Sequence, residues 1–274
     1  MMIKQLVLLQ LVSMLFTTLA YTISRHFPVK NRLNLHTAFM TSSSQNNEVV
    51  PTIPNVGKDS KRLFLVRHGE VINPGGDRPV FYGSQDVKLS PLGEQEAAAA
   101  ANYLQRFDIQ CVACSPLRRA IFGAEKVLDK QGSKALSDLV VNPGFTELNR
   151  GAWCGLTKEE IGEENLSRFD GCDITITPEG GESYPELKVR VLKARDDVLS
   201  MVDLGQAAAI VSHLQVTRCM LSESLGIPTE SMTSLKVATA SISCIDYHEN
   251  GTQTLHFQSF KPEAGLKQAK DGAN

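Results

Sequence analysis

Three short, continuous apolar runs constrain the fold of this chain more than any other feature of its sequence. They are RLFLV at 62–66, QCVACS at 110–115 and AAAIVS at 207–212. Runs of this length without polar alternation are typical of strands that are buried on both faces of a sheet. Because segments of helical length separate them, we predict an α/β fold of three layers, with a mostly parallel central sheet and helices on both faces.

Two Ser-Pro pairs mark the starts of predicted helices. At Ser90-Pro91 and at Ser115-Pro116 a serine stands at the N-cap, and a proline stands at the first helical position, where its missing N–H is tolerated. We expect the first helix to continue through 93–107 and the second to end near Lys130. Helices in these places provide the crossovers that parallel strands require.

Further helix signals lie in the C-terminal half of the chain. Thr157 and Glu160 form a capping box for a short helix. Residues 183–203 have helical periodicity, and another helix is expected after the third apolar run, ending near Leu225. The apolar face of the helix in 183–203 comprises Leu187, Val191, Ala194 and Val198.

The last predicted strands are antiparallel. Glu249-Asn250-Gly251 separates two strand-like segments at 241–248 and 252–260. Asn-Gly between such segments is a strong signal for a tight hairpin. We therefore expect antiparallel strands to extend the parallel sheet near the C-terminus.

The first 58 residues differ in composition from the rest. An apolar run at 6–20 ends in small residues, which is typical of a signal peptide, with an uncleaved signal anchor as the alternative. The following stretch is basic, rich in Ser and Thr and poor in acids, as organellar transit peptides are. We expect delivery to a plastid through this bipartite leader, with secretion or the ER lumen as the alternative. The predicted divisions are a leader at 1–21, a transit-like or disordered linker at 22–58, a folded domain at 59–262 and a flexible tail at 263–274.

Charge and cysteine content exclude some function classes. The 274 residues carry a net charge of −2 and no run rich in Lys or Arg, so we expect no nucleic-acid partner, and membrane contact only through an uncleaved leader. Cys111 and Cys114 form a C-x-x-C pair. Because they lie in an apolar run without a second pair or a nearby histidine, we interpret them as core residues rather than metal ligands.

Polar residues follow each of the three apolar runs. Arg67-His68-Gly69 follows the first, Ser115 to Arg119 the second, and His213 the third. Taken singly, each is compatible with a purely structural role. However, the carboxyl ends of parallel strands meet at one edge of a sheet, where ligands bind. Arginines and helix N-termini both favour phosphate, so this edge predicts a site for a dianion, with Gly69 allowing close backbone approach.

Five motifs, in this order, resemble those of the histidine phosphatase superfamily, which has the phosphoglycerate mutase-like fold. They are LVRHGE, SPLRRA, FTELNRGAWCGLT, GGES and IVSHLQVTR. The resemblance covers roughly residues 61–260, so it makes the domain at 59–262 a catalytic domain. It implies phosphohistidine chemistry on a phosphorylated substrate, with no metal and no other cofactor.

The resemblance also implies roles for individual residues. His68 matches the histidine that attacks phosphorus, and Arg67 and Arg119 match the arginines that bind the phosphoryl oxygens. His213 matches the second histidine, which stabilises the phosphoryl group in transfer. Glu147 matches the acid–base residue that protonates the leaving oxygen and then takes a proton from the hydrolytic water.

The loop that follows His68, where the family's substrate contacts are expected, departs from the family pattern. The mutases carry an asparagine six residues after the nucleophile, where this chain has Pro74, and Asn73 stands one place earlier. Gln215 stands two residues after the second histidine, where its side chain can reach the substrate. The alternative is that Gln215 is simply an exposed residue in the first turn of a helix. Arg118 falls at a variable position, outside the expected contacts. The expected substrate-binding residues are Arg67, Asn73, Tyr82, Gly83, Arg119, Leu214 through its backbone N–H, and Gln215.

We expect a metal-independent phosphomonoester hydrolase that acts on a small phosphorylated metabolite. Only 66 residues separate Glu147 from His213, and they contain no Arg-Arg pair, which favours hydrolysis over phosphoryl transfer between two positions of a substrate. The alternatives are phosphoglycerate mutase-type transfer and a non-catalytic module that binds phosphorylated ligands. The sequence does not predict an oligomeric state.

Overall fold

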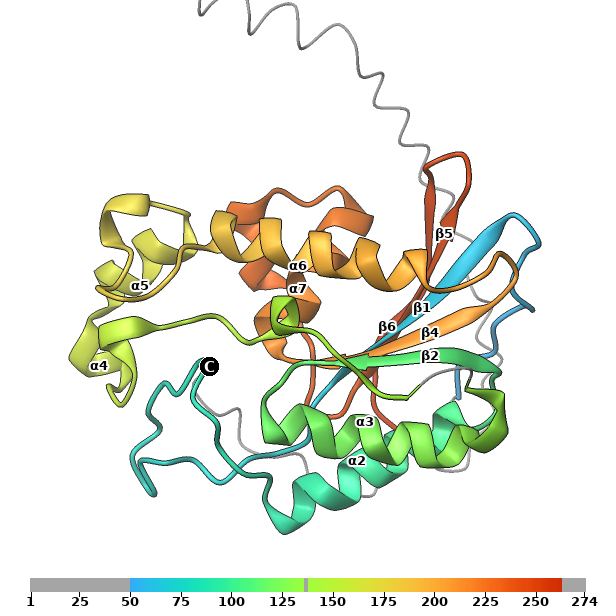
Figure 1. The fold of residues 1–274 in the computed structure, drawn as a ribbon. Coiled ribbons are helices and arrows are strands. Elements are labelled where there is room, and N and C mark those ends of the chain that lie inside the picture. The colour runs from blue at the N-terminus through green and yellow to red at the C-terminus, as the bar shows by residue number, and fades with distance from the viewer. Residues whose placement is uncertain (1–49, 136–137, 263–274) are drawn as a thin grey trace, which may run out of the picture. The chain divides into compact units, whose positions relative to one another are not determined.

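A six-stranded sheet organises the residues that the structure, a computed structural model, describes, namely 50–135 and 138–262 (Figure 1). Its strands are β1 (Ser60–Arg67), β2 (Ile109–Cys114), β3 (Val140–Val141), β4 (Ala207–Ser212), β5 (Ile242–His248) and β6 (Gln253–Phe260). Their order is β3-β2-β4-β1-β5-β6; β1 to β4 pair in parallel, and β5 and β6 extend the sheet antiparallel. The predicted mostly parallel α/β sheet is confirmed.

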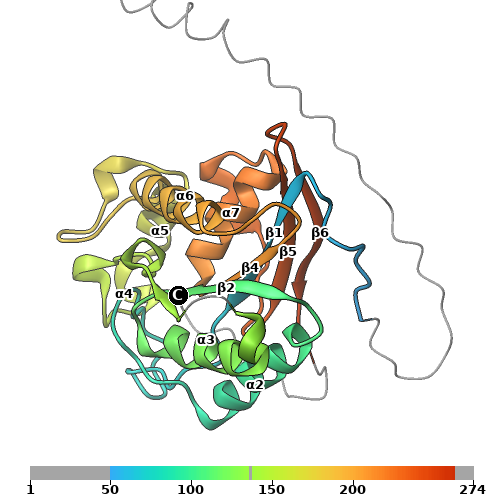
Figure 2. The same ribbon diagram turned by 45° about the vertical axis from the view of Figure 1, so that its right-hand side comes forward.

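Helices cover both faces of the sheet. The helices are α2 (Pro91–Leu104), α3 (Arg118–Gln131), α4 (Lys158–Ile161), α5 (Glu163–Asp170), α6 (Tyr184–Ser200) and α7 (Leu214–Leu225). Short 3-10 helices stand at Gly132–Lys134, Pro143–Phe145, Gly151–Trp153, Ile174–Ile176 and Thr229–Ser234. Helices α2 and α3 pack on one face, and α6 and α7 pack on the other (Figures 1 and 2). The three predicted layers are therefore present.

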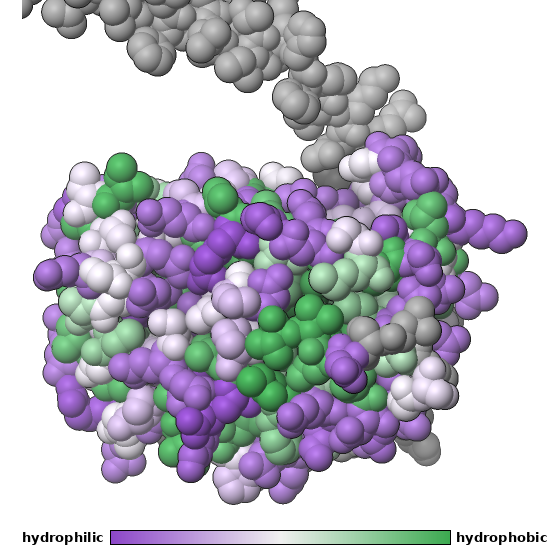
Figure 3. All heavy atoms as spheres, in the orientation of Figure 1, coloured by the Kyte–Doolittle hydropathy of each residue, from purple (hydrophilic) through white to green (hydrophobic). Residues whose placement is uncertain are grey.

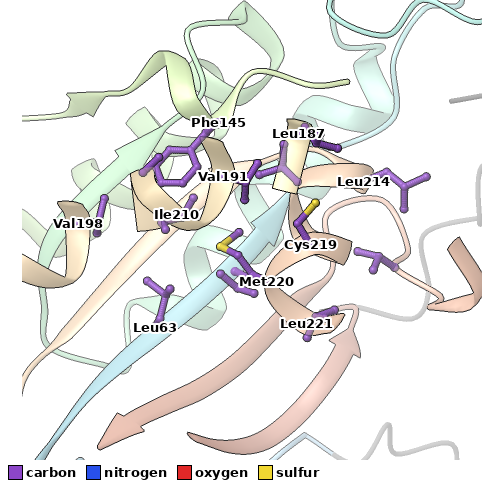
Figure 4. Packing of buried hydrophobic residues seen from close by; sticks show 14 of the residues in the cluster. Leu63, Phe145, Leu187, Val191, Val198, Ile210, Leu214, Cys219, Met220 and Leu221 are labelled. Carbon is purple, nitrogen blue, oxygen red and sulfur yellow. The ribbon is translucent and has the colours of Figure 1, made fainter. Parts of the chain in front are cut away.

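Strand β1 sends alternate side chains into two cores. Leu63 and Leu65 pack with residues of α6 and α7, whereas Phe64 and Val66 pack with residues of α2 and α3. Figure 4 shows the first core, where side chains from the sheet meet those of α6 and α7. Burying side chains of this size contributes about 1.5–3 kcal/mol each. A slip of β1 by one residue would exchange the two sets, so burial fixes its register.

The two Ser-Pro pairs have different roles in the structure. Ser90 caps α2 as predicted, because its Oγ accepts the Gly93 N–H at 3.1 Å. The prediction that Ser115-Pro116 opens the next helix is wrong, since α3 begins at Arg118 without a side-chain cap. The Ser115 hydroxyl lies 2.7 Å from Nε2 of His213 instead. The same Oγ accepts the N–H of Leu117, the residue just before α3, at 3.2 Å, so it bonds the turn that precedes the helix and no N–H of the helix itself.

The other predicted helices of the C-terminal half are present. Thr157 and Glu160 make both hydrogen bonds of a capping box at the start of α4. Helix α6 lies within the predicted segment 183–203, and α7 ends at Leu225, where the prediction placed it. The predicted apolar face of α6 is buried, with Leu187, Val191, Ala194 and Val198 at most 3% exposed.

The antiparallel edge carries a feature that the apolar pattern did not indicate. The hairpin of β5 and β6 turns at Gly251, whose φ of +80° suits glycine. Arg62 on β1 stands opposite Asp246 on β5, and its Nε and Nη2 donate to the two carboxylate oxygens at 2.7 and 2.8 Å. Both residues are buried, so a bidentate ion pair lies inside the sheet region.

The C-x-x-C pair is part of the core, as predicted. Cys111 packs in the core under α6 and α7, whereas Cys114 packs in the core under α2 and α3. Side chains three residues apart on a strand point to opposite faces, so the two thiols cannot bind one ion. Burial raises the pKa of Cys114 to about 12, which keeps this thiol protonated.

The described part of the chain begins before the predicted domain boundary at residue 59. The Pro54 carbonyl accepts a hydrogen bond from Nη1 of Arg62 at 2.7 Å, and Ile53 packs on the core under α2 and α3. Residues 50–58, expected in the linker, therefore contact the folded domain. The predicted leader, the linker up to residue 49 and the tail from 263 lie outside the described residues.

The molecular surface is shown in Figure 3 from the viewpoint of Figure 1. Hydrophilic residues dominate this face, and a group of hydrophobic residues lies near its centre. Among the helices of the described ranges, none combines the length and the apolar character needed to cross a membrane.

Candidate active site

Three strands bring polar residues to one edge of the sheet. In the pairing of β1 with β4, the His68 N–H donates to the Ser212 carbonyl at 2.9 Å. The Ser115 N–H, directly after β2, donates to the Val211 carbonyl at 3.2 Å. The ends of the three strands are therefore level with one another. We call four residues at or after these strand ends the strand-end cluster: Arg67, the last residue of β1, His68, Arg119 in the first turn of α3, and His213.

Glycines allow a close helix contact beside this cluster. A Cβ atom on Gly69 would lie 2.2 Å from the carbonyl oxygen of Gly93, and one on Gly93 would lie 1.9 Å from that of Glu70. The close backbone approach at Gly69 is thus made by α2. Glu96 of α2 also accepts the Glu70 N–H at 2.8 Å. These contacts fix the turn that follows His68.

The imidazole of His68 is held in one tautomer. Its Nδ1 lies 2.7 Å from the Gly69 carbonyl, which can only accept, so Nδ1 carries the hydrogen. Its Nε2 accepts from Nε of Arg119 at 3.3 Å, so Nε2 is unprotonated and its lone pair points toward this guanidinium. Burial, assisted by the charges of Arg119 and Arg67, holds the pKa of His68 well below its usual range. The ring is consequently neutral at physiological pH, with Nε2 as the nucleophilic atom.

Two consecutive arginines at the start of α3 face different surroundings. Arg119 is 0% exposed, and its Nη1 and Nη2 donate to the carbonyls of Gln85 and Gly83 at 2.6 and 2.8 Å. Arg118 is 53% exposed in its side chain and pairs with Asp86 at 2.8 Å. The helix thus directs Arg119 into the cluster and Arg118 into solvent.

His213 is the N-cap residue of α7, directly after β4. Its ring centroid lies 5.1 Å from that of His68, and its Nε2 lies 2.7 Å from Oγ of Ser115. Its Nδ1 is buried and contacts no partner among the described residues. Burial and then the charge of Arg119 hold the pKa of His213 well below its usual range. A second neutral imidazole thus lies beside the first.

Glu147 contacts the first turn of α7, the helix that follows His213. Its Oε1 accepts the Leu148 N–H at 2.7 Å, and its Oε2 accepts the Gln215 N–H at 3.2 Å. Arg190 of α6 supports the preceding backbone by donating to the Thr146 carbonyl at 2.7 Å. The carboxylate is therefore anchored to the first turn of α7, two residues after His213.

The substrate contacts expected from the loop after β1 lie in two places. Tyr82 and Gly83 border the strand-end cluster: the Tyr82 ring centroid is 5.4 Å from the guanidinium carbon of Arg119, and the Gly83 carbonyl holds the same group. Asn73 uses its amide within its own loop, donating to Val80 and accepting from Gly75. The structure brings Tyr82 and Gly83 to the cluster and gives Asn73 a local structural role.

The residues after His213 lie in the first turn of α7. Leu214 begins the helix, so its N–H belongs to the helix N-terminus beside the cluster. Gln215 is 2% exposed, and its Oε1 accepts from Nη1 of Arg218 at 3.3 Å. The alternative that Gln215 is an exposed first-turn residue is therefore wrong.

Three residues near the site were not singled out for it from the sequence. Ser115 was interpreted as a helix cap at the start of the polar stretch after the second apolar run, Arg190 was assigned no role, and Arg218 was only the last residue of the motif IVSHLQVTR. The spacing of Arg218, three residues after Gln215, places the two side chains on one helical face and was an available signal. No sequence pattern linked Arg190 to the Glu147 loop.

The reactive ring is almost completely shielded in this structure. His68 is 2% exposed, and Arg119 and His213 are 0% exposed. The exposed part of His68 is therefore small, and the hydrogen bond from Arg119 must be given up when Nε2 attacks phosphorus. The loop that contains Gly83 and Gln85 also encloses the site, because its two carbonyls accept hydrogen bonds from Arg119.

One group of potential metal ligands lies away from this site. The ligand atoms of Cys244, Asp246 and His256 lie within 4.8 Å of one another. However, Arg62 donates to both oxygens of Asp246 and also lies 3.3 Å from Nε2 of His256. A guanidinium in this position disfavours a divalent cation by charge repulsion. We interpret the group as a buried ion pair extended by a histidine.

The sheet with a histidine–arginine cluster at its carboxyl edge defines a class of α/β proteins suited to holding a phosphoryl group. Within that class, residues 63–259 match the family model described as histidine phosphatase superfamily (branch 1), and the chain belongs to this superfamily.

Curated relatives include proteins of two kinds. The chain is 31% identical over 198 residues to bifunctional protein Rv2228c of Mycobacterium tuberculosis. The matched region covers 71% of this chain and 52% of that protein. It is 32% identical over 194 residues to the protein named Probable phosphoglycerate mutase GpmB of Enterobacter sp., covering 69% of this chain and 86% of the relative. The chain thus spans about half the length of the first relative and most of the second.

Solved structures share the fold. YhfR of Bacillus stearothermophilus has a TM-score of 0.64 at 23% identity and covers 73% of this chain and 97% of its own. The alpha-ribazole phosphatase from Shigella flexneri has a TM-score of 0.62 at 26% identity, with the same two coverages. The first likeness shows the fold alone, and the second belongs to a protein named as a phosphatase.

Proposed function

We propose that the chain is a metal-independent phosphomonoester hydrolase that works through a phosphohistidine on His68 and acts on a small phosphorylated metabolite. The observation that carries this proposal is the arrangement of His68. Its Nε2 is unprotonated and faces the buried guanidinium of Arg119, so nucleophile and phosphate-binding cation are adjacent. Phosphoryl transfer depends mainly on such positioning and on charge neutralisation.

In the first step, Nε2 of His68 attacks phosphorus. The N–P bond forms, the bond from phosphorus to the ester oxygen breaks, and the protonated carboxyl of Glu147 gives its proton to the leaving oxygen. Arg67 and Arg119 neutralise the phosphoryl oxygens. The buried Nδ1 of His213, which has no acceptor among the described residues, is available as a further hydrogen-bond donor to this group.

In the second step, water replaces the histidine. The ionised Glu147 takes a proton from the attacking water, the P–O bond forms, and the N–P bond breaks to regenerate neutral His68 and phosphate. The anchoring of Glu147 to α7 supports this double role, because the carboxylate stays beside His213 throughout.

Hydrolysis is supported over mutase-type transfer by the 147–213 interval. It lacks an Arg-Arg pair, and three of its four arginines, Arg168, Arg190 and Arg195, are paired with Asp173, Glu182 and Asp196, respectively. The fourth, Arg150, has no ion pair among the described residues. Transfer between two positions remains the second candidate, because a relative at 32% identity carries the name Probable phosphoglycerate mutase GpmB.

The composition of the first 58 residues supports a further proposal, delivery to a plastid. A fusion of residues 1–58 to a fluorescent protein tests it. Colocalisation with plastid markers supports delivery there, whereas fluorescence in the secretory pathway contradicts it.

The central test combines hydrolysis with trapping of the intermediate. The full chain is incubated with p-nitrophenyl phosphate and EDTA, and parallel samples with a labelled ester are quenched in base, which preserves phosphohistidine. We expect chelator-resistant turnover and label on the protein in wild type. His68→Ala should abolish both.

His248→Ala is the matched control, because His248 lies in the β5–β6 hairpin and bonds only Thr254 through its ring. Its activity should match wild type. An inactive wild-type protein that still binds phosphate would instead support the non-catalytic binding module.

A further inference from the structure

Glu96 of α2 is a buried acid to which the proposed mechanism gives no part. Its side chain is 0% exposed, which is rare for a glutamate. Its Oε2 accepts the Glu70 N–H at 2.8 Å, and its Oε1 accepts from Nζ of Lys261 and, at 3.3 Å, from Oγ1 of Thr239. A buried carboxylate is tolerated only when it is paired and hydrogen-bonded, and these three partners meet that condition.

One peptide group joins Glu96 to the imidazole of His68. The Gly69 carbonyl, which lies 2.7 Å from Nδ1 of His68, belongs to the same peptide unit as the Glu70 N–H. In a planar trans peptide the C=O and the N–H point in opposite directions, so the carbonyl faces the ring while the N–H faces the carboxylate. Rotation of this peptide would break both hydrogen bonds. Glu96 therefore fixes, from the far side, the carbonyl to which His68 donates.

The chain after β6 holds Glu96 in place. Lys261 directly follows this strand, and its Nζ donates both to Oε1 of Glu96 and, at 3.1 Å, to Oγ1 of Thr239. The next residue, Ala240, donates its N–H to the His68 carbonyl at 3.0 Å. The Lys261 side chain is 13% exposed, so solvent screens its ion pair with Glu96 only weakly. The end of the described chain thus reaches the turn that carries the nucleophile.

These contacts form a continuous series from a cation to the reactive ring. The series runs from the Lys261 ammonium through the Glu96 carboxylate and the 69–70 peptide to Nδ1 of His68. Hydrogen bonds in series polarise one another, so a carboxylate at the N–H end makes the carbonyl a stronger acceptor. A stronger acceptor keeps the hydrogen on Nδ1 and leaves Nε2 as the atom with the lone pair.

Other contacts already fasten α2 to the turn after β1. The Ser90 N–H donates to the Glu70 carbonyl at 3.0 Å, and its hydroxyl donates to the Glu70 carboxylate at 2.6 Å. Gly93 packs directly on the backbone of Glu70. A purely structural attachment of the helix is met by these contacts without a buried ion pair. What Glu96 adds is the bond to the N–H of the peptide that His68 uses.

We propose that Glu96 is a positioning residue that fixes the tautomer and orientation of His68 through the 69–70 peptide, and that Lys261 holds Glu96 in the required place. This inference rests on the proposed function, because it concerns how the nucleophile of that reaction is prepared. It gives a functional role to the end of β6, a strand that contributes no residue to the strand-end cluster.

The test observes the ring of His68 by nitrogen-15 NMR of the full chain labelled at histidine. The chain has six histidines, so the His68 signals are identified by their absence in His68→Asn. We expect wild type to show a protonated Nδ1 and an unprotonated Nε2. This measurement needs no substrate, so its result does not depend on whether the protein is a hydrolase.

A double variant removes the acceptor together with its cation. Glu96→Leu combined with Lys261→Met leaves no buried charge unpaired, and such replacements of buried ion pairs are often tolerated. We expect the Nε2-protonated tautomer of His68 to appear. We also expect kcat/KM for p-nitrophenyl phosphate to fall about 10- to 100-fold, as when groups that orient metal-binding histidines are lost. The matched control is Glu94→Leu with Lys193→Met, the same changes at exposed positions, which should leave both measurements unchanged.

Single variants separate charge from geometry. Glu96→Gln keeps an oxygen that can accept the Glu70 N–H, so the Nδ1 tautomer should persist. Its kcat/KM should fall about threefold to tenfold, because the polarisation by the carboxylate is lost. Lys261→Arg keeps the cation and should restore activity to near the wild-type value. Where the double variant does not fold, Glu96→Gln decides, and wild-type kcat/KM with wild-type His68 signals in that variant overturns the inference.

The outcomes distinguish this inference from the proposed function. A double variant that folds and keeps both the wild-type tautomer and the wild-type kcat/KM overturns the inference. Lost activity with unchanged His68 signals also overturns it, because the loss then arises away from the ring. Wild type that is inactive on every ester, while the double variant still changes the tautomer, contradicts the proposed function and supports the positioning contact.

Discussion

The strand-end cluster and the segment at 147–183 contribute to the same site but are built in different ways. The cluster follows level strands, and its backbone is fixed by the sheet, for example by the bond from His68 to Ser212. The 147–183 segment contains no strand, only short α and 3-10 helices. Glu147, the proposed acid–base residue, is held there by hydrogen bonds from the Leu148 and Gln215 N–H groups.

This difference separates two parts of the proposed reaction. A residue at a strand end keeps its position as long as the sheet exists, so the proposed nucleophile and phosphate-binding groups belong there. A segment held by side chains can change without altering the sheet. We infer that the cluster holds the phosphoryl group, whereas the 147–183 segment supplies Glu147, the proposed acid–base residue.

The strongest test of the cluster compares adjacent arginines. Arg119→Ala removes the guanidinium that contacts His68, so we expect kcat/KM for p-nitrophenyl phosphate to fall about 1,000-fold or more. Arg118→Ala should change it less than about threefold, because an exposed ion pair contributes little. Similar losses in the two variants would mean that the cluster is not the phosphate site.

The contribution of the 147–183 segment is tested by the leaving group. Glu147→Gln should slow hydrolysis of alkyl phosphates about 100-fold, because the leaving alkoxide needs a proton. The effect on p-nitrophenyl phosphate should be about tenfold or less, since nitrophenolate is a stable leaving group. Glu94→Gln, in the exposed first turn of α2, is the control. Equal losses on both ester types would contradict the role of Glu147 as the acid.

The pH dependence of the free energy of unfolding provides a second test of the cluster. His68 and His213 have lowered pKa values when folded and ordinary values near 6.5 when unfolded. Below pH 6.5 the unfolded chain therefore binds more protons, and the free energy of unfolding falls as the pH falls. Each histidine contributes about 1.4 kcal/mol per pH unit until its folded pKa is reached.

His68→Asn should remove one of these contributions. Urea unfolding at pH 7, 6 and 5 should therefore show a shallower pH dependence for the variant than for wild type. If the free energy of unfolding had the same pH dependence in the variant and in wild type, His68 would not be held neutral in the folded protein.

The smallest effect is expected at Asn73, in the loop after β1. Its amide bonds Val80 and Gly75, so Asn73→Ala should lower the free energy of unfolding by about 1 kcal/mol. KM should change less than about twofold for any ester. A large rise in KM with unchanged stability would instead place Asn73 at the substrate.

Sequence reasoning was most successful where the sheet decides position. The three apolar runs predicted β1, β2 and β4, and the residues after them are those that the structure brings together. The prediction failed at Ser115. The Ser-Pro pattern of a helix cap is local in sequence, whereas the contact of Ser115 with His213 joins residues that are distant in sequence. Arg62 was missed for a similar reason: its partner Asp246 is set by the pairing of β1 with β5, which no local pattern contains.

The 147–183 segment was predicted less completely. The capping box at Thr157 was found because it is a local motif, and Glu147 was identified by resemblance. The burial of Arg150 between aromatic rings depends on Phe81 and Phe169, which are distant in sequence. Contacts of this kind have no period or spacing by which they can be found.

The nearly complete enclosure of the His68 ring bears on the lifetime of a covalent intermediate. If a phosphorylated imidazole is as enclosed as the free ring, water would meet it mainly during brief openings of the protein. For activated esters, turnover would then follow the frequency of those openings and fall as solvent viscosity rises. During such an opening, a small alcohol in the medium would compete with water as the acceptor, and the ratio of new ester to free phosphate would report which molecules can enter.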